Sequence, residues 1–158
     1  MKQRTCLLIK PDGMEKKVIG KVLDRFEREG LDLAALKMVP PDRKKIEEFY
    51  AIHKGKPFYD SFIEFMLEGP LVAMVWEGED VVSRCRQIIG QTNSKEASPG
   101  TLRHLYGTDN RRNLVHASDS EASAEREMNL LFRKEEILHY SPGTRNFSAK
   151  SILSPKRN

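Results

Sequence analysis

Hydrophobic positions along the chain alternate between strand-like runs and helix-like spacings. The apolar stretch 5–9 precedes the turn sequence 10–13, where proline and glycine predict the end of a strand. A second strand is expected over 31–39, because two prolines follow it. The unbroken apolar run 71–76 is typical of a buried central strand, and 114–116 is expected to form a short last strand.

Helical spacing separates these strands. Apolar residues recur every three or four positions over 19–26, and Gly30 stands where a C-terminal cap belongs. Shorter helices are expected over 46–50 and 58–65, and another over 81–89.

The second half of the chain adds a long loop and a last helix. Segment 91–112 is polar and lacks sustained periodicity, so we expect a loop, and a loop of that length in a compact domain is more often functional than idle. The sequence from Ser118 to Glu121 matches a capping box, which predicts a helix from there to about Arg133.

The order strand, helix, strand, helices, strand, helix, strand predicts an α+β fold. We expect a ferredoxin-like sandwich, in which helices cover a four-stranded antiparallel sheet. The chain has no internal repeat and no dividing linker, so residues 1–140 are predicted to be one domain, followed by a basic C-terminal extension over 141–158.

Charge and composition indicate the cellular compartment and the classes of partner that the protein can have. The net charge of +4 equals the charge of the extension, which holds four basic residues and no acidic one. A solvated tail is favoured over one that binds nucleic acid. The chain shows no secretory signal and no apolar run long enough to cross a membrane, and its two cysteines form no metal motif. A soluble protein of the reducing cytoplasm, without a membrane partner, is therefore expected.

Common phosphate-binding and metal motifs are absent from the sequence. It contains no P-loop spacing, no GxGxxG and no HExxH, and no carboxylate cluster suggests a dedicated metal site. Phosphate binding would therefore depend on side chains.

The segment Asn113-Leu-Val-His116-Ala-Ser118-Asp-Ser holds the densest group of reactive side chains. His116 is placed at a strand end just before a helix N-terminus, which favours a nearby phosphate, and imidazole is a competent nucleophile. Glu127 lies on the following helix, on the face of two small serines, and could orient the ring. The pattern alone also fits an ordinary strand-end histidine beside a helix cap, and by itself it favours that interpretation.

Five separated motifs, which span about residues 4–140, together resemble the nucleoside diphosphate kinase family. They are Ile9-Lys10-Pro11-Asp12-Gly13, Gly69-Pro70 with Ala73-Met74-Val75-Trp76-Glu77-Gly78, Gly90-x-Thr92-Asn93, Pro99-Gly100-Thr101-x-Arg103, and Asn113-x-x-His116-x-Ser118-Asp119-Ser120. The resemblance implies a kinase that passes the γ-phosphoryl group from ATP or another nucleoside triphosphate to a nucleoside diphosphate, by a ping-pong route through a phosphohistidine at His116. It also implies Mg²⁺ carried with the nucleotide and a homo-oligomer, either a tetramer or a hexamer.

The resemblance also implies roles for individual residues. Besides His116, it makes Glu127, Ser118 and Lys10 catalytic: Glu127 bonds the histidine, and Ser118 assists at the leaving or entering oxygen. The resemblance implies that Lys10 and Asn113 bond the ribose hydroxyls and that Phe58 stacks on the base. Tyr50 is implied to lie beside Lys10 and the phosphates. The implied phosphate ligands are Lys10, Arg86, Thr92 and Arg103.

Four positions depart from the family pattern. Ala117 replaces the usual glycine after the histidine, and Ser94 replaces a common proline, so we expect less backbone freedom and a less rigid loop there. Asn110 replaces an apolar residue that faces the base, and Phe62 replaces a smaller aliphatic one. Ala117, Ser94 and Asn110, with the basic tail, motivate a rival hypothesis, a regulatory module that binds nucleotides or nucleic acid. A purely structural scaffold is a third and weaker hypothesis.

Overall fold

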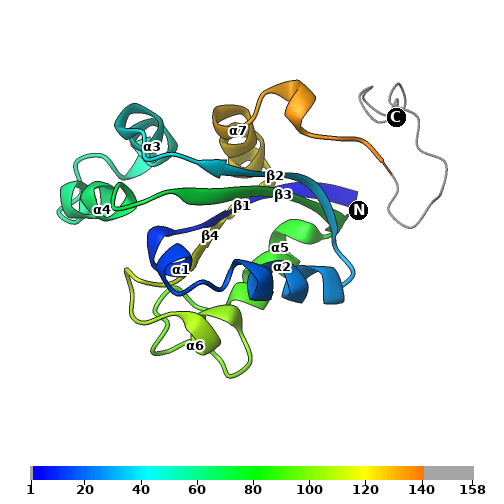
Figure 1. Ribbon diagram of the computed structural model, residues 1–158, viewed down its shortest axis with the longest axis horizontal. Helices are drawn as coiled ribbons and strands as arrows, with labels where there is room; N and C mark the ends of the chain where they lie inside the picture. Colours follow the sequence, from blue (N-terminus) through cyan, green and yellow to red (C-terminus); the bar gives the residue numbers. More distant parts are fainter. Residues whose placement is uncertain (1, 141–158) are drawn as a thin grey trace.

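A four-stranded antiparallel sheet forms the centre of the molecule, and the computed structural model describes residues 2–140 (Figure 1). The predicted basic extension, 141–158, lies outside the described residues. The strands are β1 (Lys2–Ile9), β2 (Asp32–Val39), β3 (Leu71–Glu79) and β4 (Val115–Ala117), arranged in the order β2-β3-β1-β4. This is the predicted ferredoxin-like α+β topology, which is confirmed.

The helices that connect the strands are mostly short. They are α1 (Pro11–Glu15), α2 (Ile19–Arg28), α3 (Arg43–Phe49), α4 (Tyr59–Met66), α5 (Val81–Ile89), α6 (Leu102–Tyr106) and α7 (Glu121–Leu131), with short 3-10 turns at Ala51–His53 and Lys134–Glu136. Helices α3 and α7 lie on one side of the sheet, and α2, α5 and α6 lie on the other (Figure 1).

Alternation along the central strands divides the interior into two cores. Leu8 of β1 packs in a cluster with residues of α3, α4 and α7, whereas its neighbour Leu7 packs in a cluster with residues of α2, α5 and α6. Successive side chains of a strand point to opposite faces, so one apolar strand supplies both layers. In the second core Phe26 and Trp76 are fully buried, with ring centroids 5.3 Å apart. The unbroken apolar run of β3 is thereby explained, because both faces are covered.

Three local predictions were wrong. The expected turn at 10–13 opens α1, because proline is well suited to the first position of a helix. The long polar loop contains α6, a helix of five residues, too short to create periodicity. The last helix begins after Ser120, whose hydroxyl accepts the amide of Ser123; it does not begin at Ser118, which is fully buried.

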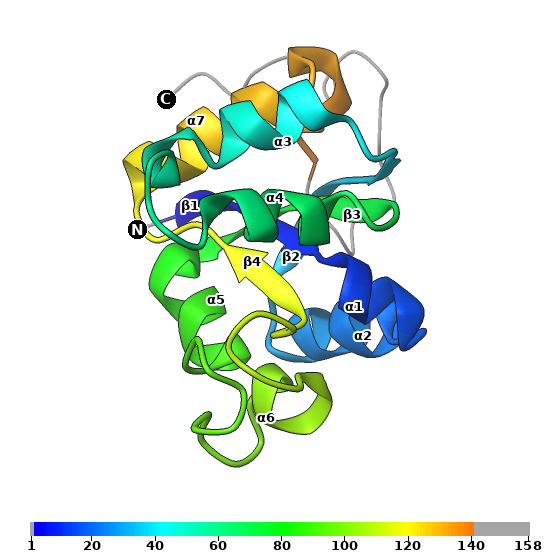
Figure 2. The ribbon, with the colours of Figure 1, turned by 90° about the vertical axis from the view of Figure 1, so that its left-hand side faces the viewer.

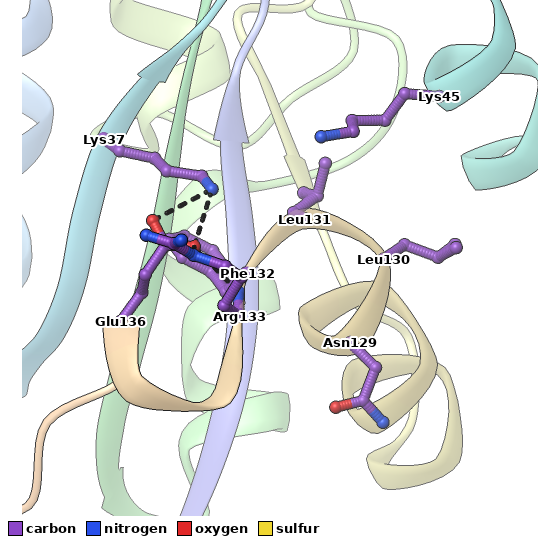
Figure 3. Close-up of a pocket in the computed structure, with 8 residues that line it drawn as sticks. All are labelled: Lys37, Lys45, Asn129, Leu130, Leu131, Phe132, Arg133 and Glu136. Atoms are coloured by element: carbon purple, nitrogen blue, oxygen red, sulfur yellow. Dashed lines mark hydrogen bonds and ion pairs between the residues drawn. The ribbon is translucent and has the colours of Figure 1, made fainter. Parts of the chain in front are cut away.

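The segment after α7 returns to the edge strand β2. Figure 3 shows Lys37 of β2 bonded to both carboxylate oxygens of Glu136, at 3.1 and 3.2 Å. The Lys37 ammonium also lies 5.0 Å from the centroid of the Phe132 ring. A hollow of about 370 Å³ opens beside this contact, at the C-terminal end of α7. Within residues 2–140 the model has no helix long and apolar enough to cross a membrane.

The start of α1 depends on a glycine that leaves no room for a side chain. A Cβ atom at Gly13 would lie 2.7 Å from Cγ2 of Ile9 and 3.2 Å from the carbonyl oxygen of Leu114. Gly13→Ala is therefore expected to lower the free energy of unfolding by about 1–3 kcal/mol, as overpacked cores do. Urea denaturation measures the change.

Gly20, in α2, is the matched control, because a Cβ there would meet nothing within 4 Å. Gly20→Ala is expected to raise stability by about 0.5–1 kcal/mol, since alanine is the better helix former. Equal effects of the two substitutions would contradict the crowding at Gly13.

Candidate active site

A cavity of about 480 Å³ lies beside β4, where the segments that follow β1, β2, β3 and β4 meet. In Figure 2, β4 is at the front, between α4 and the segment that contains α6. The predicted site residues that line the cavity are Lys10, Tyr50, Phe58, Arg86, Thr92, Arg103, Asn113, His116 and Glu127. They come from positions up to 117 residues apart, so the fold gathers nearly the whole predicted set.

His116 lies in β4, and its ring is oriented by a buried carboxylate. The Nε2 atom of His116 is 2.7 Å from Oε1 of Glu127, whose side chain is only 5% exposed. The hydroxyl of Ser118 donates to the same oxygen at 2.8 Å. With Nε2 held by Glu127, Nδ1 is the ring nitrogen left for a reacting group.

Two aromatic rings restrict the tilt of the imidazole. Phe49 and Tyr50 each meet the His116 ring edge-on, with centroids at 5.0 and 5.7 Å. Burial, with the charge of Glu127 adding to it, raises the pKa of the Tyr50 hydroxyl far above its usual value. The raised pKa keeps this buried hydroxyl uncharged at neutral pH, and it has no hydrogen-bond partner among the described residues.

Lys10 places a nearly buried ammonium in the cavity. Its Nζ atom donates to the side-chain oxygen of Asn113 and, at 2.8 Å, to the carbonyl of Arg111. The ammonium also lies 5.4 and 5.3 Å from the ring centroids of Phe62 and Phe65. Burial lowers the pKa of Lys10 to about 7, and although Asp12 opposes this shift, the nearby arginines add to it. An anionic ligand would reverse the shift by favouring the charged form.

Two arginines face the cavity while they hold the strand that carries His116. Buried Arg103 donates from Nε to the carbonyl of Asn113 at 3.2 Å, and from Nη2 to that of Val115 at 2.9 Å. Its Nη1 donates to the carbonyl of Gly90 at 2.9 Å. Arg86 donates to the carbonyl of Ala117 at 3.1 Å. Burial, with Arg86 adding to it, lowers the pKa of Arg103 to about 10, so the guanidinium stays charged at neutral pH.

The chain turns into β4 through a left-handed residue. Leu114 has a φ of 76° although it is not glycine, and it is fully buried. Its amide donates to Oδ2 of Asp12 at 2.9 Å, and its carbonyl accepts from the amide of Lys10 at 2.9 Å. Such conformations persist only where surrounding contacts hold them. The segment after β1 therefore fixes the backbone two residues before His116.

The remaining predicted ligands lie around this centre. The side-chain amide of Asn113 donates to the carbonyls of Thr92 and Asn110, at 3.0 and 3.2 Å, so it joins the two halves of the long loop. Phe58 is at the rim and 46% exposed, which agrees poorly with the core position that its helical spacing alone suggests.

Ser118 is the one predicted site residue that does not line the cavity, since its side chain is fully buried behind Glu127. Conversely, the sequence patterns gave no role to Arg111 or Arg126, and Asp12 was quoted only as part of a motif. The cavity is lined by Arg111 and Arg126 but not by Asp12. For Arg126, the available signal in the sequence was its position on the predicted helix, one residue before Glu127.

The departures from the family pattern have local explanations. Ala117 lies in β4, paired with Leu7, and has no positive φ, so the lost glycine does not disturb the backbone. The amide of Ser94 donates to the carbonyl of Asp109 at 3.3 Å, a bond that proline could not form. Phe62 meets the ring of Tyr50 edge-on at 4.7 Å, and Asn110 is exposed at the cavity wall.

The cavity is rich in cations. It is lined by Lys10, Arg86, Arg103, Arg111 and Arg126, against the carboxylates of Asp119 and Glu127. Among residues 2–140, the model contains no cluster of three or more His, Cys, Asp or Glu side chains that could hold a metal ion. The arrangement is suited to a polyanion next to a nucleophilic imidazole.

Comparison with known proteins gives one consistent result. The family model described as nucleoside diphosphate kinase matches residues 3–137. A nucleoside diphosphate kinase of Staphylothermus marinus is 49% identical over 138 residues, which are 87% of this chain and 98% of that protein. One of Saccharomyces cerevisiae is 47% identical over 138 residues, which cover 87% of this chain and 90% of that protein.

Solved structures agree with the sequence matches. A nucleoside diphosphate kinase of Halobacterium salinarum, in complex with CDP, has a TM-score of 0.88 and 39% identity, and the match covers 90% of this chain and 95% of that one. The enzyme of Aquifex aeolicus has a TM-score of 0.85 and 46% identity, over 87% of this chain and 99% of that one.

Asp12 is expected to stabilise the fold through the left-handed turn. Asp12→Ala leaves the buried amide of Leu114 without its acceptor and should lower the free energy of unfolding by about 2 kcal/mol. Asp12→Asn keeps an acceptor oxygen, so it should lower the free energy of unfolding much less. Asp24→Ala, which removes an exposed carboxylate paired with Arg28, should change stability by less than about 0.5 kcal/mol. Urea unfolding of the three variants compares them, and a near-neutral Asp12→Ala would contradict this role.

Proposed function

This chain belongs to the nucleoside diphosphate kinase family, and we propose that its phosphoryl transfer proceeds through a covalent phosphate on His116. The reaction moves the γ-phosphoryl group of a nucleoside triphosphate to a nucleoside diphosphate. One observation carries the proposal: Nε2 of His116 is held by Glu127, so Nδ1 is left for a phosphate in a cavity whose charged lining residues are mostly cations.

In the first half of the reaction, the lone pair of His116 Nδ1 attacks the γ-phosphorus. An N–P bond forms, and the bond from that phosphorus to the β,γ-bridging oxygen breaks, so the nucleoside diphosphate leaves with the bonding electrons. The Nε2 proton stays on the ring and donates to Oε1 of Glu127, which stabilises the charge that the imidazole acquires. Ser118 donates to the same oxygen and is fully buried, so we assign it to positioning Glu127 rather than to contact with a phosphate oxygen.

In the second half, a β-phosphate oxygen of a nucleoside diphosphate attacks the phosphorus. The N–P bond breaks, and its electrons return to Nδ1 of His116. Both halves need the phosphorus to be aligned with its nucleophile and its negative charge to be neutralised, with little covalent work by the protein.

Lys10, Arg86 and Arg103 are the proposed phosphate ligands. Arg103 uses three donor atoms on backbone carbonyls, but its guanidinium carries five N–H groups, so two remain for phosphate oxygens. These cations are held by the protein before a nucleotide arrives, so little reorganisation is needed in the reaction. Thr92 lies at the cavity wall beside them and would add a hydroxyl donor.

Mg²⁺ is proposed to enter with the nucleotide. The residues present fit this, because the only carboxylates of the described residues that line the cavity are Asp119 and Glu127, and Glu127 already accepts two hydrogen bonds. The ion would neutralise part of the charge of the phosphate chain.

The nucleoside is proposed to lie between the phosphate ligands and the rim. Asn113 and Lys10, which are bonded to each other, would bond the ribose hydroxyls, and exposed Phe58 would stack on the base. Tyr50 would border the phosphates and Lys10. Stacking does not depend on the hydrogen-bonding edge of a base, so purines and pyrimidines should both be accepted.

Assembly and location are the remaining proposals. We propose a homo-oligomer, a tetramer or a hexamer, which is supported by the exposed apolar side chains of Leu36 and Met38 on edge strand β2. A reducing cytoplasm is supported by Cys6 and Cys85, which are free thiols buried in the fold.

Covalent labelling tests the assignment of His116. Incubation with γ-labelled ATP should give an acid-labile, base-stable phosphoprotein that any nucleoside diphosphate discharges. His116→Ala should lose the label, and its turnover should fall by roughly a thousandfold or more. His104→Ala removes an exposed imidazole on α6, and this variant should retain both the label and the turnover. Labelling that survives in the His116 variant would refute the mechanism.

The lowered pKa of Lys10 predicts proton uptake on nucleotide binding. With a pKa of about 7, Lys10 is mostly neutral at pH 8, and a bound phosphate should raise the pKa and draw a proton in. At pH 5.5 the amine is already charged, so no uptake by Lys10 is expected. Calorimetric titration with ADP in buffers of different ionisation enthalpy should measure up to one proton per site at pH 8.

Lys10→Arg is the control for this measurement, because a guanidinium stays protonated at both pH values. Binding by this variant should show no extra uptake at pH 8. Equal uptake by the wild-type protein and the variant would assign the proton to another group.

A further inference from the structure

A side-chain hydrogen bond joins two segments that the sequence patterns did not connect. Nη2 of Arg111, in the loop before β4, donates to the hydroxyl of Ser61 in α4 at 2.7 Å, although the two residues are 50 positions apart. This bond joins the loop wall of the cavity, which includes Asn110, to the helical wall, which begins at Phe58.

A second hydrogen bond connects Ser61 to the backbone of Phe58. The hydroxyl of Ser61 donates to the carbonyl of Phe58 at 3.1 Å, so Arg111, Ser61 and Phe58 form one hydrogen-bonded series. Phe58 is the N-cap residue of α4, has no side-chain cap bond and is 46% exposed. Its ring centroid lies 5.9 Å from the centroid of the His53 ring and 5.9 Å from Nζ of Lys56, and the position of its backbone also decides where the ring lies.

At its other end, Arg111 is tied to the centre of the site. Its carbonyl accepts from Nζ of Lys10 at 2.8 Å. Its amide and that of Arg112 donate to Oδ1 of Asp109, at 3.0 and 2.7 Å, which holds this turn in one conformation. The guanidinium of Arg111 is thus anchored on a backbone that also contacts Lys10.

We propose that Arg111 is a positioning residue that sets the width of the slot in which the nucleotide base lies. Its bond to Ser61 holds Phe58 at a fixed separation from the loop that carries Asn110 and Asn113. The proposal rests on the proposed function, which assigns Phe58 to the base. Arg111 acts through Ser61 and Phe58, without contact to the reacting phosphate.

The exposure of the hydrogen bond between Arg111 and Ser61 limits how much its loss can weaken nucleotide binding. The link is exposed and water competes for it, so its loss should weaken affinity by at most roughly tenfold, the low end of what a hydrogen bond with a charged partner contributes. Loss of the link should weaken stacking on Phe58, and a purine, with its larger ring, should lose more than a pyrimidine. The ratio of purine to pyrimidine affinity should therefore fall.

The test uses Arg111→Ala, Ser61→Ala and the double variant of the full-length chain. Calorimetric titration with ADP should show about three- to tenfold weaker binding for each single variant, and the double variant should be no weaker than Arg111→Ala. Titration with CDP should show a smaller loss than ADP. In steady-state assays the change should appear in KM for ADP far more than in kcat.

Arg43→Ala is the matched control. Arg43 also pairs with α4, through Glu64, but it does not line the cavity. Its removal should leave ADP affinity and the ratio of ADP to CDP affinity unchanged, so a general loosening of α4 is distinguished from loss of the Arg111 link.

Two results would overturn the proposal. Additive losses in the double variant, or a loss with Arg111→Ala but none with Ser61→Ala, would mean that Arg111 acts on the nucleotide directly. Unchanged ADP binding in both single variants would remove any role in binding. Failure of the His116 mechanism is separate, because it would appear as a missing phosphoprotein in the wild-type chain while the ADP titrations still report on the link.

Discussion

The left-handed turn at Leu114 is the constraint on which the site depends. The backbone around His116 is held less by strand pairing, since β4 has three residues, than by side chains: Asp12 accepts from Leu114, and Arg103 and Arg86 donate to carbonyls on either side of the histidine. Because the same arginines face the cavity, the strand that carries His116 and the side chains proposed as phosphate ligands form one rigid unit. Their spacing is set by folding rather than by the arrival of a nucleotide.

Much of the fold could be predicted from the hydrophobic pattern. The strands follow from apolar runs and their proline or glycine ends, and the order of elements led to the correct topology. The errors fall where a helix is too short to show a period. Helix α6 has five residues, and α1 begins with a proline that indicates a turn and a helix start equally well.

The family resemblance named a set of residues that, apart from Ser118, all line one cavity, and their roles as nucleophile and ligands stay predictions. Lys10 and Arg103 carry weak local signals, and they become significant because several motifs occur together. The resemblance could not reveal Asp12 as the acceptor for an amide 102 positions away, or Arg111 as a link to α4, because these contacts depend on side-chain geometry. The lowered pKa of Lys10 is equally hidden, since burial causes it.

The carbonyl bonds of Arg103 also affect how this sequence should be compared with others. A lysine has one nitrogen on a flexible stem and could not replace a fork that reaches the carbonyls of Asn113, Val115 and Gly90. A descendant that had lost the reaction but kept the fold would still be under selection to retain this arginine. Its presence in a homologue would therefore be poor evidence for an active enzyme, whereas His116, whose side chain bonds a carboxylate rather than a backbone carbonyl, could be replaced in a pseudoenzyme.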